Sequence, residues 1–233
     1  MTQLTKYLYA AGKVAAEDKA LIILPEIYGV QDFTRELAGK VQTELGWTSY
    51  VLDHFYAETG KAQIFDYADA TPGMEIMQKM TGEKYLALLN KAIVEVQKLQ
   101  PHVERIAIWG FCFGGKLAYL SGVDHRVTDI VSFYGGASLA QDFYQGGSVI
   151  DALTEVRRQD QALRVFAAFG ENDEMIPASD VSAIHERIDQ AGIAAEVHVY
   201  AAGHAFFNED RTDRYDAAAA QKAWTDVKKF LRA

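Results

Sequence analysis

The chain has one cysteine and four prolines in 233 residues, and it contains no long hydrophobic run. A single cysteine cannot form a disulfide within the chain, so folding does not require an oxidising compartment. No stretch approaches the ~20 apolar residues that span a membrane. The N-terminus lacks the charged segment and apolar run of a secretion signal. We therefore expect a cytoplasmic protein that does not enter a membrane.

Positive charge is also scarce, because 23 Lys and Arg face 32 Asp and Glu, a formal net charge of −9. This balance argues against nucleic acid or an anionic membrane surface as a main partner. The length suits one substantial hydrophobic core, so we expect a single domain over residues 1–233. Five histidines show no spacing typical of metal ligands, and we expect no metal site there: His54, His102, His125, His185 and His198.

Short apolar runs alternate with helix-like segments along the chain. This alternation predicts a doubly wound, mostly parallel sheet with helices on both faces. The expected strands are residues 20–25, 48–53, 105–109, 127–134, 163–169 and 195–200. The expected helices are residues 32–45, 74–100 with a break near Thr81-Gly82, 149–158, 178–191 and 213–231.

Other segments fit this pattern less simply. Asp32 is a plausible N-cap of the first helix and Gly46 a plausible stop. Residues 54–73 resemble a loop, and residues 1–14 an edge strand or hairpin. Residues 137–161 form a longer excursion that could cover a pocket as a lid.

The segment Gly110-Phe111-Cys112-Phe113-Gly114-Gly115 lies between an expected strand and an expected helix. Strand, sharp glycine-flanked turn and helix are the context of a nucleophile elbow, with Cys112 at its apex. A β-carbon at Gly110 or Gly114 would clash with the closely passing strand and helix. A lone cysteine is nevertheless often a small buried hydrophobe, so this motif does not decide its role by itself.

Two further residues follow the ends of later strands. Asp173 lies after the strand at 163–169, and His204 lies after the strand at 195–200. Functional groups gather at the carboxyl edge of parallel sheets. The order nucleophile, acid, histidine is that of α/β-hydrolases. Asp173 could instead cap the helix that follows, and Glu171 and Asp180 compete for the role of the acid.

Four segments together resemble the dienelactone hydrolase family, an α/β-hydrolase branch that uses cysteine. They are residues 24–29 (LPEIYG), 110–115 (GFCFGG), 170–177 (GENDEMIP) and 202–207 (AGHAFF). The resemblance implies an α/β-hydrolase fold and hydrolysis of carboxylic esters or lactones through a thioester acyl-enzyme. It implies a catalytic triad of Cys112, Asp173 and His204, and no cofactor.

The resemblance also implies roles around this triad. Glu26 matches a glutamate that is implicated in activating the thiol, and Tyr134 matches a tyrosine near the family's pocket. The backbone N–H groups of Ile27 and Phe113 would form the oxyanion hole. The expected ligand is a small ester, lactone or thioester, bound by a monomer or small homo-oligomer.

One position departs from the family. Dienelactone hydrolases bind the substrate carboxylate with two arginines, and the arginine four residues after the histidine is Asn208 here. We place Asn208 at the substrate and expect a neutral ester to be accepted at least as well as an anionic one. Arg211 or Arg214 could reach the pocket.

A different class of function remains open on the same fold. A non-hydrolytic ligand-binding protein or a thiol redox sensor would use the same activated cysteine. A redox sensor usually needs a resolving cysteine, which this chain lacks. A serine nucleophile is disfavoured because no G-x-S-x-G motif occurs.

Overall fold

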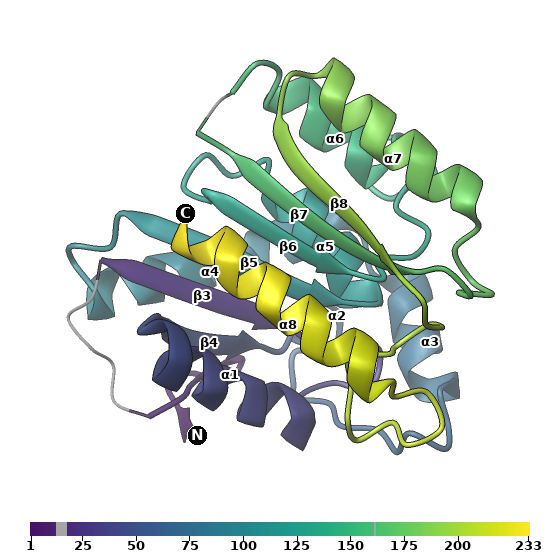
Figure 1. Ribbon diagram of the computed structural model, residues 1–233. Coiled ribbons are helices and arrows are strands. Elements are labelled where there is room, and N and C mark those ends of the chain that lie inside the picture. Colours follow the sequence, from purple (N-terminus) through teal and green to yellow (C-terminus); the bar gives the residue numbers. More distant parts are fainter. Residues whose placement is uncertain (13–17, 161) are drawn as a thin grey trace.

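One eight-stranded sheet forms the centre of the protein (Figure 1). The computed structural model describes residues 1–12, 18–160 and 162–233. The strand order is β1-β2-β4-β3-β5-β6-β7-β8. β1 and β2 form an antiparallel hairpin on β4, and all the other neighbouring strands are parallel. The strands are β1 (Thr2–Gln3), β2 (Leu8–Ala10), β3 (Lys19–Leu24), β4 (Thr48–Leu52), β5 (Arg105–Phe111), β6 (Asp129–Phe133), β7 (Arg164–Gly170) and β8 (Ala194–Tyr200).

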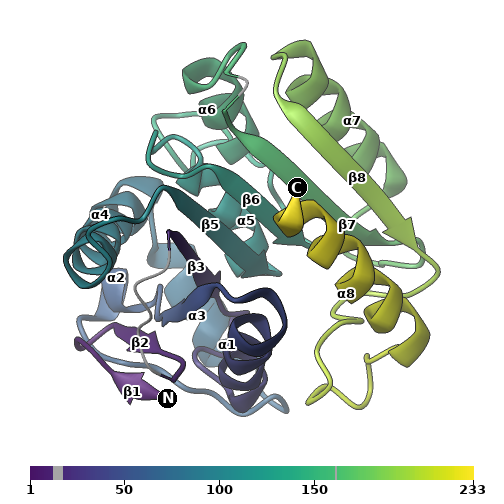
Figure 2. The same ribbon diagram turned by 60° about the vertical axis from the view of Figure 1, so that its left-hand side comes forward.

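Helices cover both faces of this sheet. α1 and α8 lie on one face, and α4, α5, α6 and α7 lie on the other (Figures 1 and 2). The central strands β3, β5, β6 and β7 are almost wholly buried, which explains their continuous apolar sequences. The predicted doubly wound sheet is therefore confirmed. The helices are α1 (Asp32–Leu45), α2 (Tyr56–Thr59), α3 (Thr71–Lys79), α4 (Gly82–Leu99), α5 (Phe113–Ser121), α6 (Val149–Val156), α7 (Ala178–Gln190) and α8 (Ala217–Arg232).

Most predicted elements are found within a few residues of their expected bounds. The break near Thr81-Gly82 separates α3 from α4, where the Thr81 side chain caps α4. The N-terminal hairpin is present, although residues 13–14 of that prediction lie outside the described residues. None of the described helices is long and apolar enough to cross a membrane.

Three local predictions were wrong. Residues 54–73 are not all loop, because they contain α2 and the start of α3. The last helix begins at Ala217, with Asp216 as its N-cap, and not at Asp213. Gln31 rather than Asp32 is the N-cap of α1, and its side chain makes no capping bond. Instead, the Asp210 carboxylate accepts the N–H of Phe33 at 2.9 Å from across the sequence.

Glycines make the turn between β5 and α5 possible. A β-carbon on Gly110 would overlap the Gly114 carbonyl, and one on Gly114 would overlap the carbonyl oxygens of Leu24 and Pro25. The strand before the turn and the helix after it therefore approach closer than any side chain allows. This close approach presents residue 112 at the carboxyl edge of the sheet.

We expect Gly110→Ala to lower the free energy of unfolding by about 3 kcal/mol, because the added methyl meets rigid backbone. Gly39→Ala is the matched control, since Gly39 lies within α1 and has open space around it. It should stabilise the protein by roughly 0.5–1 kcal/mol through helix propensity. Urea unfolding of both variants measures the difference, and equal stability of Gly110→Ala and wild type would contradict the close approach.

Candidate active site

Cys112 occupies the apex of the turn between β5 and α5. Its backbone has φ 52° and ψ −114°, a conformation that is strained for a residue with a side chain. Hydrogen bonds hold it there: its N–H donates to Phe133 at 3.0 Å, and its carbonyl accepts the N–H of Lys116 at 3.1 Å. The thiol is free and partly exposed. The structure thus gives Cys112 the geometry that a nucleophile elbow requires.

Asp173 and His204 meet at the same edge of the sheet. The Nδ1 atom of His204 lies 2.8 Å from Oδ2 of Asp173, and both residues are buried. The other carboxylate oxygen accepts the N–H groups of Met175 and Ile176 at 2.8 and 3.2 Å. Asp173 therefore holds a turn through one carboxylate oxygen and orients the imidazole of His204 through the other. It does not cap α7, whose N-cap is Pro177.

The environment of His204 favours its protonated form. Burial alone lowers the pKa of His204, but the hydrogen bond to Asp173 and the proximity of Cys112 outweigh it and raise the pKa to about 10. The Nε2 atom is buried and, apart from the interaction with Cys112 that raises the pKa, has no hydrogen-bond partner among the described residues. It is thus available to exchange a proton with the thiol or with a bound substrate.

Glu26 is buried close to these residues, in the loop after β3. Its carboxylate accepts the hydroxyl of Tyr134 at 3.3 Å and the side-chain amide of Asn208 at 3.2 Å. Asn208 also donates to the hydroxyl of Tyr67 at 3.1 Å. Burial raises the pKa of Glu26, and Arg211 and these hydrogen bonds only partly offset that effect.

Tyr134 and Asn208, which we predict to lie at the substrate, are both hydrogen-bonded to Glu26. Both are almost fully inaccessible, at 0% and 1% exposure. Their polar atoms point at Glu26 and not into a cavity. Tyr134 has a positive φ of 39°, and its ring lies 5.1 Å from the ring of His204. The two side chains thus form a buried support behind the carboxylate.

Two cavities meet at the thiol and the imidazole. A larger one of about 350 Å³ and a smaller one of about 170 Å³ share Cys112, Met175 and His204 in their walls. The larger is otherwise lined by Met77, Gln78, Met80, Phe113, Lys116, Gly136, Ala137, Gln141, Asp142 and Phe143. The smaller is otherwise lined by Glu26, Ile27, Tyr28, Ala70, Met74, Ala205, Arg211 and Arg214.

The predicted oxyanion-hole residues lie on either side of this junction. Phe113 lines the larger cavity and Ile27 the smaller one. Within the described residues, neither backbone N–H donates a hydrogen bond to another group. Two free backbone N–H groups on either side of the Cys112 thiol are suited to stabilise a negative charge that develops on a bound oxygen.

The excursion after β6 forms one wall of the larger cavity, through residues between Ala137 and Phe143. It then continues into α6, and its last residue, 161, lies outside the described residues. Whether this wall acts as a lid stays a prediction. Four of the five methionines also line the two cavities: Met74, Met77, Met80 and Met175. Such flexible thioethers adapt to differently shaped apolar groups.

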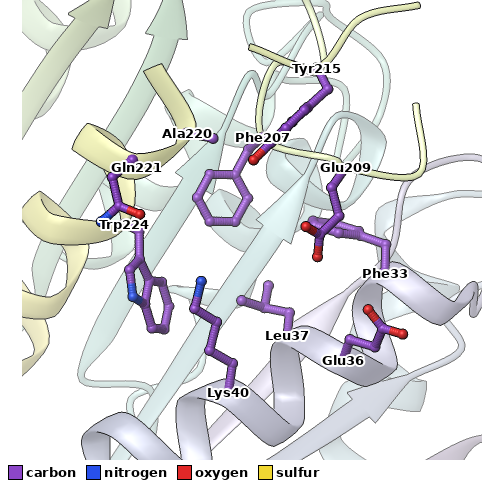
Figure 3. A pocket seen from close by; sticks show the side chains of 10 residues that line it. All are labelled: Phe33, Glu36, Leu37, Lys40, Phe207, Glu209, Tyr215, Ala220, Gln221 and Trp224. Atoms are coloured by element: carbon purple, nitrogen blue, oxygen red, sulfur yellow. The ribbon is translucent and has the colours of Figure 1, made fainter. Parts of the chain in front are cut away.

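Another cavity, of about 260 Å³, lies between α1 and α8 (Figure 3). The buried aromatic side chains of Phe33, Phe207 and Trp224 and the exposed side chains of Lys40 and Glu36 line it. None of the residues predicted for catalysis lines it. Among the described residues, no cluster of three or more His, Cys, Asp or Glu side chains could hold a metal ion.

Comparison with known proteins shows the family to which this chain belongs. The model of the "Dienelactone hydrolase family" matches residues 7–233. The chain belongs to the dienelactone hydrolase family. As a member of this family, it is an enzyme that hydrolyses carboxylic esters.

Individual relatives of the dienelactone hydrolase family agree in sequence and fold. Two proteins named "Putative carboxymethylenebutenolidase" are similar. The one from Escherichia coli (strain K12) is 25% identical over 91% of this chain and 76% of its own length. The one from Synechocystis sp. is 28% identical over 96% and 90%. A crystal structure from Klebsiella pneumoniae subsp. pneumoniae MGH 78578, described as a "Putative Dienelactone Hydrolase", has a TM-score of 0.78 at 22% identity. It covers 91% of this chain and 86% of that one. This likeness confirms the α/β-hydrolase fold.

Three residues at this dienelactone hydrolase site were missed by sequence reasoning. Lys116 lies in the larger cavity, Tyr67 bonds to Asn208, and His54 packs against Phe113. The spacing of Lys116, four residues after Cys112 on a helix, was a usable signal, because such residues share a face. Nothing local to Tyr67 or His54 predicts their contacts.

His54 makes stability sensitive to acid. It is fully buried, its ring nitrogens have no partner among the described residues, and burial lowers its pKa to about 3. The unfolded chain takes up this proton near pH 6.5 and the folded chain does not, so stability falls as pH drops from 6.5 toward 3. We expect His54→Leu to raise the free energy of unfolding more at pH 5 than at pH 8. The exposed His185→Leu should show no such difference, and equal gains at both pH values would contradict a neutral buried His54.

Proposed function

We propose that this enzyme hydrolyses carboxylic esters or lactones through a Cys112–His204–Asp173 triad and a thioester acyl-enzyme. One observation carries the proposal: a cysteine at a strained elbow shares the junction of two cavities with a histidine that a buried carboxylate orients. Each group then has the role that acyl transfer by a triad requires.

Acylation starts from a Cys112 thiolate whose proton resides on Nε2 of His204, the protonation state that the raised pKa of His204 favours. The thiolate sulfur attacks the substrate carbonyl carbon, and the carbonyl electron pair moves onto oxygen. The N–H groups of Phe113 and Ile27 donate to this oxyanion. When the tetrahedral intermediate collapses, the bond to the leaving oxygen breaks and that oxygen takes the proton from His204. A thioester on Cys112 and a free alcohol result.

Deacylation repeats these steps with water. Nε2 of His204 takes a proton from water as its oxygen attacks the thioester carbonyl. The second tetrahedral intermediate expels the Cys112 sulfur as a thiolate beside protonated His204, and the carboxylic acid leaves. Throughout, Asp173 holds the imidazole through Nδ1 and stabilises its protonated form.

Glu26 acts on the thiol from the smaller cavity. A carboxylate beside Cys112 disfavours the thiolate in the empty enzyme and so protects it from oxidation. We propose that Tyr134 and Asn208 hold Glu26 in this place through the two hydrogen bonds described above. They would then be positioning residues, and substrate would meet Glu26 first.

The substrate has an acyl part and an alcohol part, and the two cavities offer a place for each. In a lactone the two parts are joined, so a ring would lie across the junction at Cys112. The names of the Escherichia coli and Synechocystis relatives, which describe butenolidases, support a lactone. The apolar methionines favour substrates with hydrocarbon surface.

Iodoacetamide tests this function with the wild-type protein, since Cys112 is the one thiol in the chain. We expect turnover of p-nitrophenyl acetate and of a lactone to disappear in parallel as that thiol is alkylated. His204→Ala should abolish both activities while the protein stays folded. Full activity after complete alkylation, or no turnover of any ester, lactone or thioester by the untreated protein, would contradict the proposal.

A further inference from the structure

Lys116 is a buried cation without a counter-charge. It lies in the first turns of α5 and is 7% exposed. No ion pair or hydrogen bond of its ammonium group is found in the part of the chain that the structure describes. Its Nζ atom lies 4.0 Å from the centroid of the Phe143 ring, on the wall of the larger cavity. Buried lysines are rarely left unpaired, because desolvation of the charge is costly.

The surroundings of Lys116 do not compensate its positive charge. Burial lowers its pKa to about 8, so the ammonium form still predominates at neutral pH. Its position near the start of α5 places it at the positive end of a helix dipole. The acidic side chain on the same cavity wall, Asp142, is exposed and forms no ion pair with it. Cys112 and His204, the other titratable groups of this wall, form the catalytic pair.

The two arginines of the smaller cavity differ from Lys116 because each has a carboxylate partner. Arg211 and Arg214 both pair with Asp213, at 3.3 and 3.4 Å. The guanidinium of Arg211 also stacks over the rings of Tyr28 and Tyr67. Two carboxylates, Asp213 and the buried Glu26, thus act on these two guanidinium groups, whereas no carboxylate pairs with Lys116. An anion that enters the site therefore gains the largest Coulomb attraction beside Lys116.

In place of the neutral ester that Asn208 led us to expect, we propose that Lys116 is a specificity-determining residue that binds a carboxylate carried by the substrate at a distance from the scissile carbonyl. Lys116 follows Cys112 by four residues, about 6 Å along the helix axis. A short hydrocarbon chain therefore separates the reacting carbonyl from the anionic end. The chain would pack against Met77, Met80 and Phe143, and the carboxylate would pair with the ammonium. This inference rests on the proposed hydrolase function and deepens it.

Matched ester pairs test this proposal, because each pair differs in one charged end. On the acyl side they are the monophenyl ester of adipic acid and phenyl hexanoate. On the alcohol side they are 4-acetoxybenzoate and 4-methylphenyl acetate. We expect wild type to prefer the anionic member of one pair in kcat/KM. Lys116→Met should reduce that anionic-to-neutral ratio by about 10-fold to 100-fold, and Lys116→Arg should keep part of it. A change in thiol reactivity alone would affect both members equally and leave the ratio unchanged.

Control variants and a binding measurement separate the outcomes. Lys98→Met should leave the ratio unchanged, since Lys98 is exposed on α4 and paired with Glu95. Calorimetry of adipate with Cys112→Ala protein needs no turnover, and adding Lys116→Met should weaken binding at least about 10-fold. The proposal is overturned if neither pair shows a preference, if Lys116→Met keeps it, or if only Arg211→Met removes it. Absence of turnover of every ester, lactone and thioester by wild type would instead refute the proposed function, and calorimetry would still decide the role of Lys116.

Discussion

Cys112→Ala is expected to lower kcat/KM for p-nitrophenyl acetate at least about 10⁴-fold. Removing the nucleophile of a triad leaves only binding and oxyanion stabilisation, which give a small residual rate. The chain has no second thiol and no G-x-S-x-G serine that could substitute. Initial rates of p-nitrophenol release by the two proteins, at equal concentration and with early time points, measure the loss. A burst in wild type would show that deacylation is the slow step.

The fold of this variant needs its own control, because residue 112 has a positive φ. Thermal unfolding should show Cys112→Ala within a few degrees of wild type, since alanine and cysteine have similar volumes. Ellman's reagent should find one thiol in wild type and none in the variant. Equal release of p-nitrophenol by both folded proteins would mean that the elbow cysteine is not the nucleophile.

Asp173→Asn is expected to lower kcat by about 10³–10⁴-fold with little effect on KM. The asparagine oxygen can still accept the N–H groups of Met175 and Ile176, so the turn should persist. Its NH₂ would face Nδ1 of His204 and force the proton onto Nε2, which then cannot accept the thiol proton. The pKa of His204 should fall from about 10, because the charge and hydrogen bond that raise it are lost.

Glu171→Gln and Asp180→Asn are the matched controls for this prediction. Both side chains lie near Asp173 in the sequence, and neither forms a hydrogen bond or ion pair with His204 within the described residues. Their kcat values should stay within about twofold of wild type. NMR titration of the His204 ring follows the pKa. A normal kcat for Asp173→Asn, or a large loss in either control, would assign the acid to another residue.

The sequence predicts this fold well because its signals are local. Buried strands such as β3 and β5 are continuous apolar runs, and the glycines of the elbow mark the one turn that a nucleophile needs. The residues proposed as the triad each follow a strand, so parallel pairing brings them to one edge. Asp173 illustrates the limit, since sequence alone left capping and catalysis as alternatives, and the structure shows that its two oxygens serve a turn and His204 separately.

Contacts between distant segments could not be predicted in this way. The first turn of α1 is capped by Asp210, which lies 177 residues along the chain, so Asp32 was preferred on local grounds. Asp213 and Asp216 are both good helix starts, and only the folded chain distinguishes them. The burial of Lys116 depends on Phe143, which the excursion after β6 supplies. Side-chain environments of this kind arise from tertiary packing and not from periodicity.

Mass spectrometry of acid-quenched wild-type protein tests the central claim most directly. The protein is mixed with p-nitrophenyl acetate, quenched during early turnover, and digested at low pH so that thioesters survive. We predict one added acetyl group on the peptide that contains Cys112, with faster loss in wild type than in Asp173→Asn protein. Turnover with no acetylated peptide in either protein, or with the acetyl group on another residue, would contradict a thioester acyl-enzyme at Cys112.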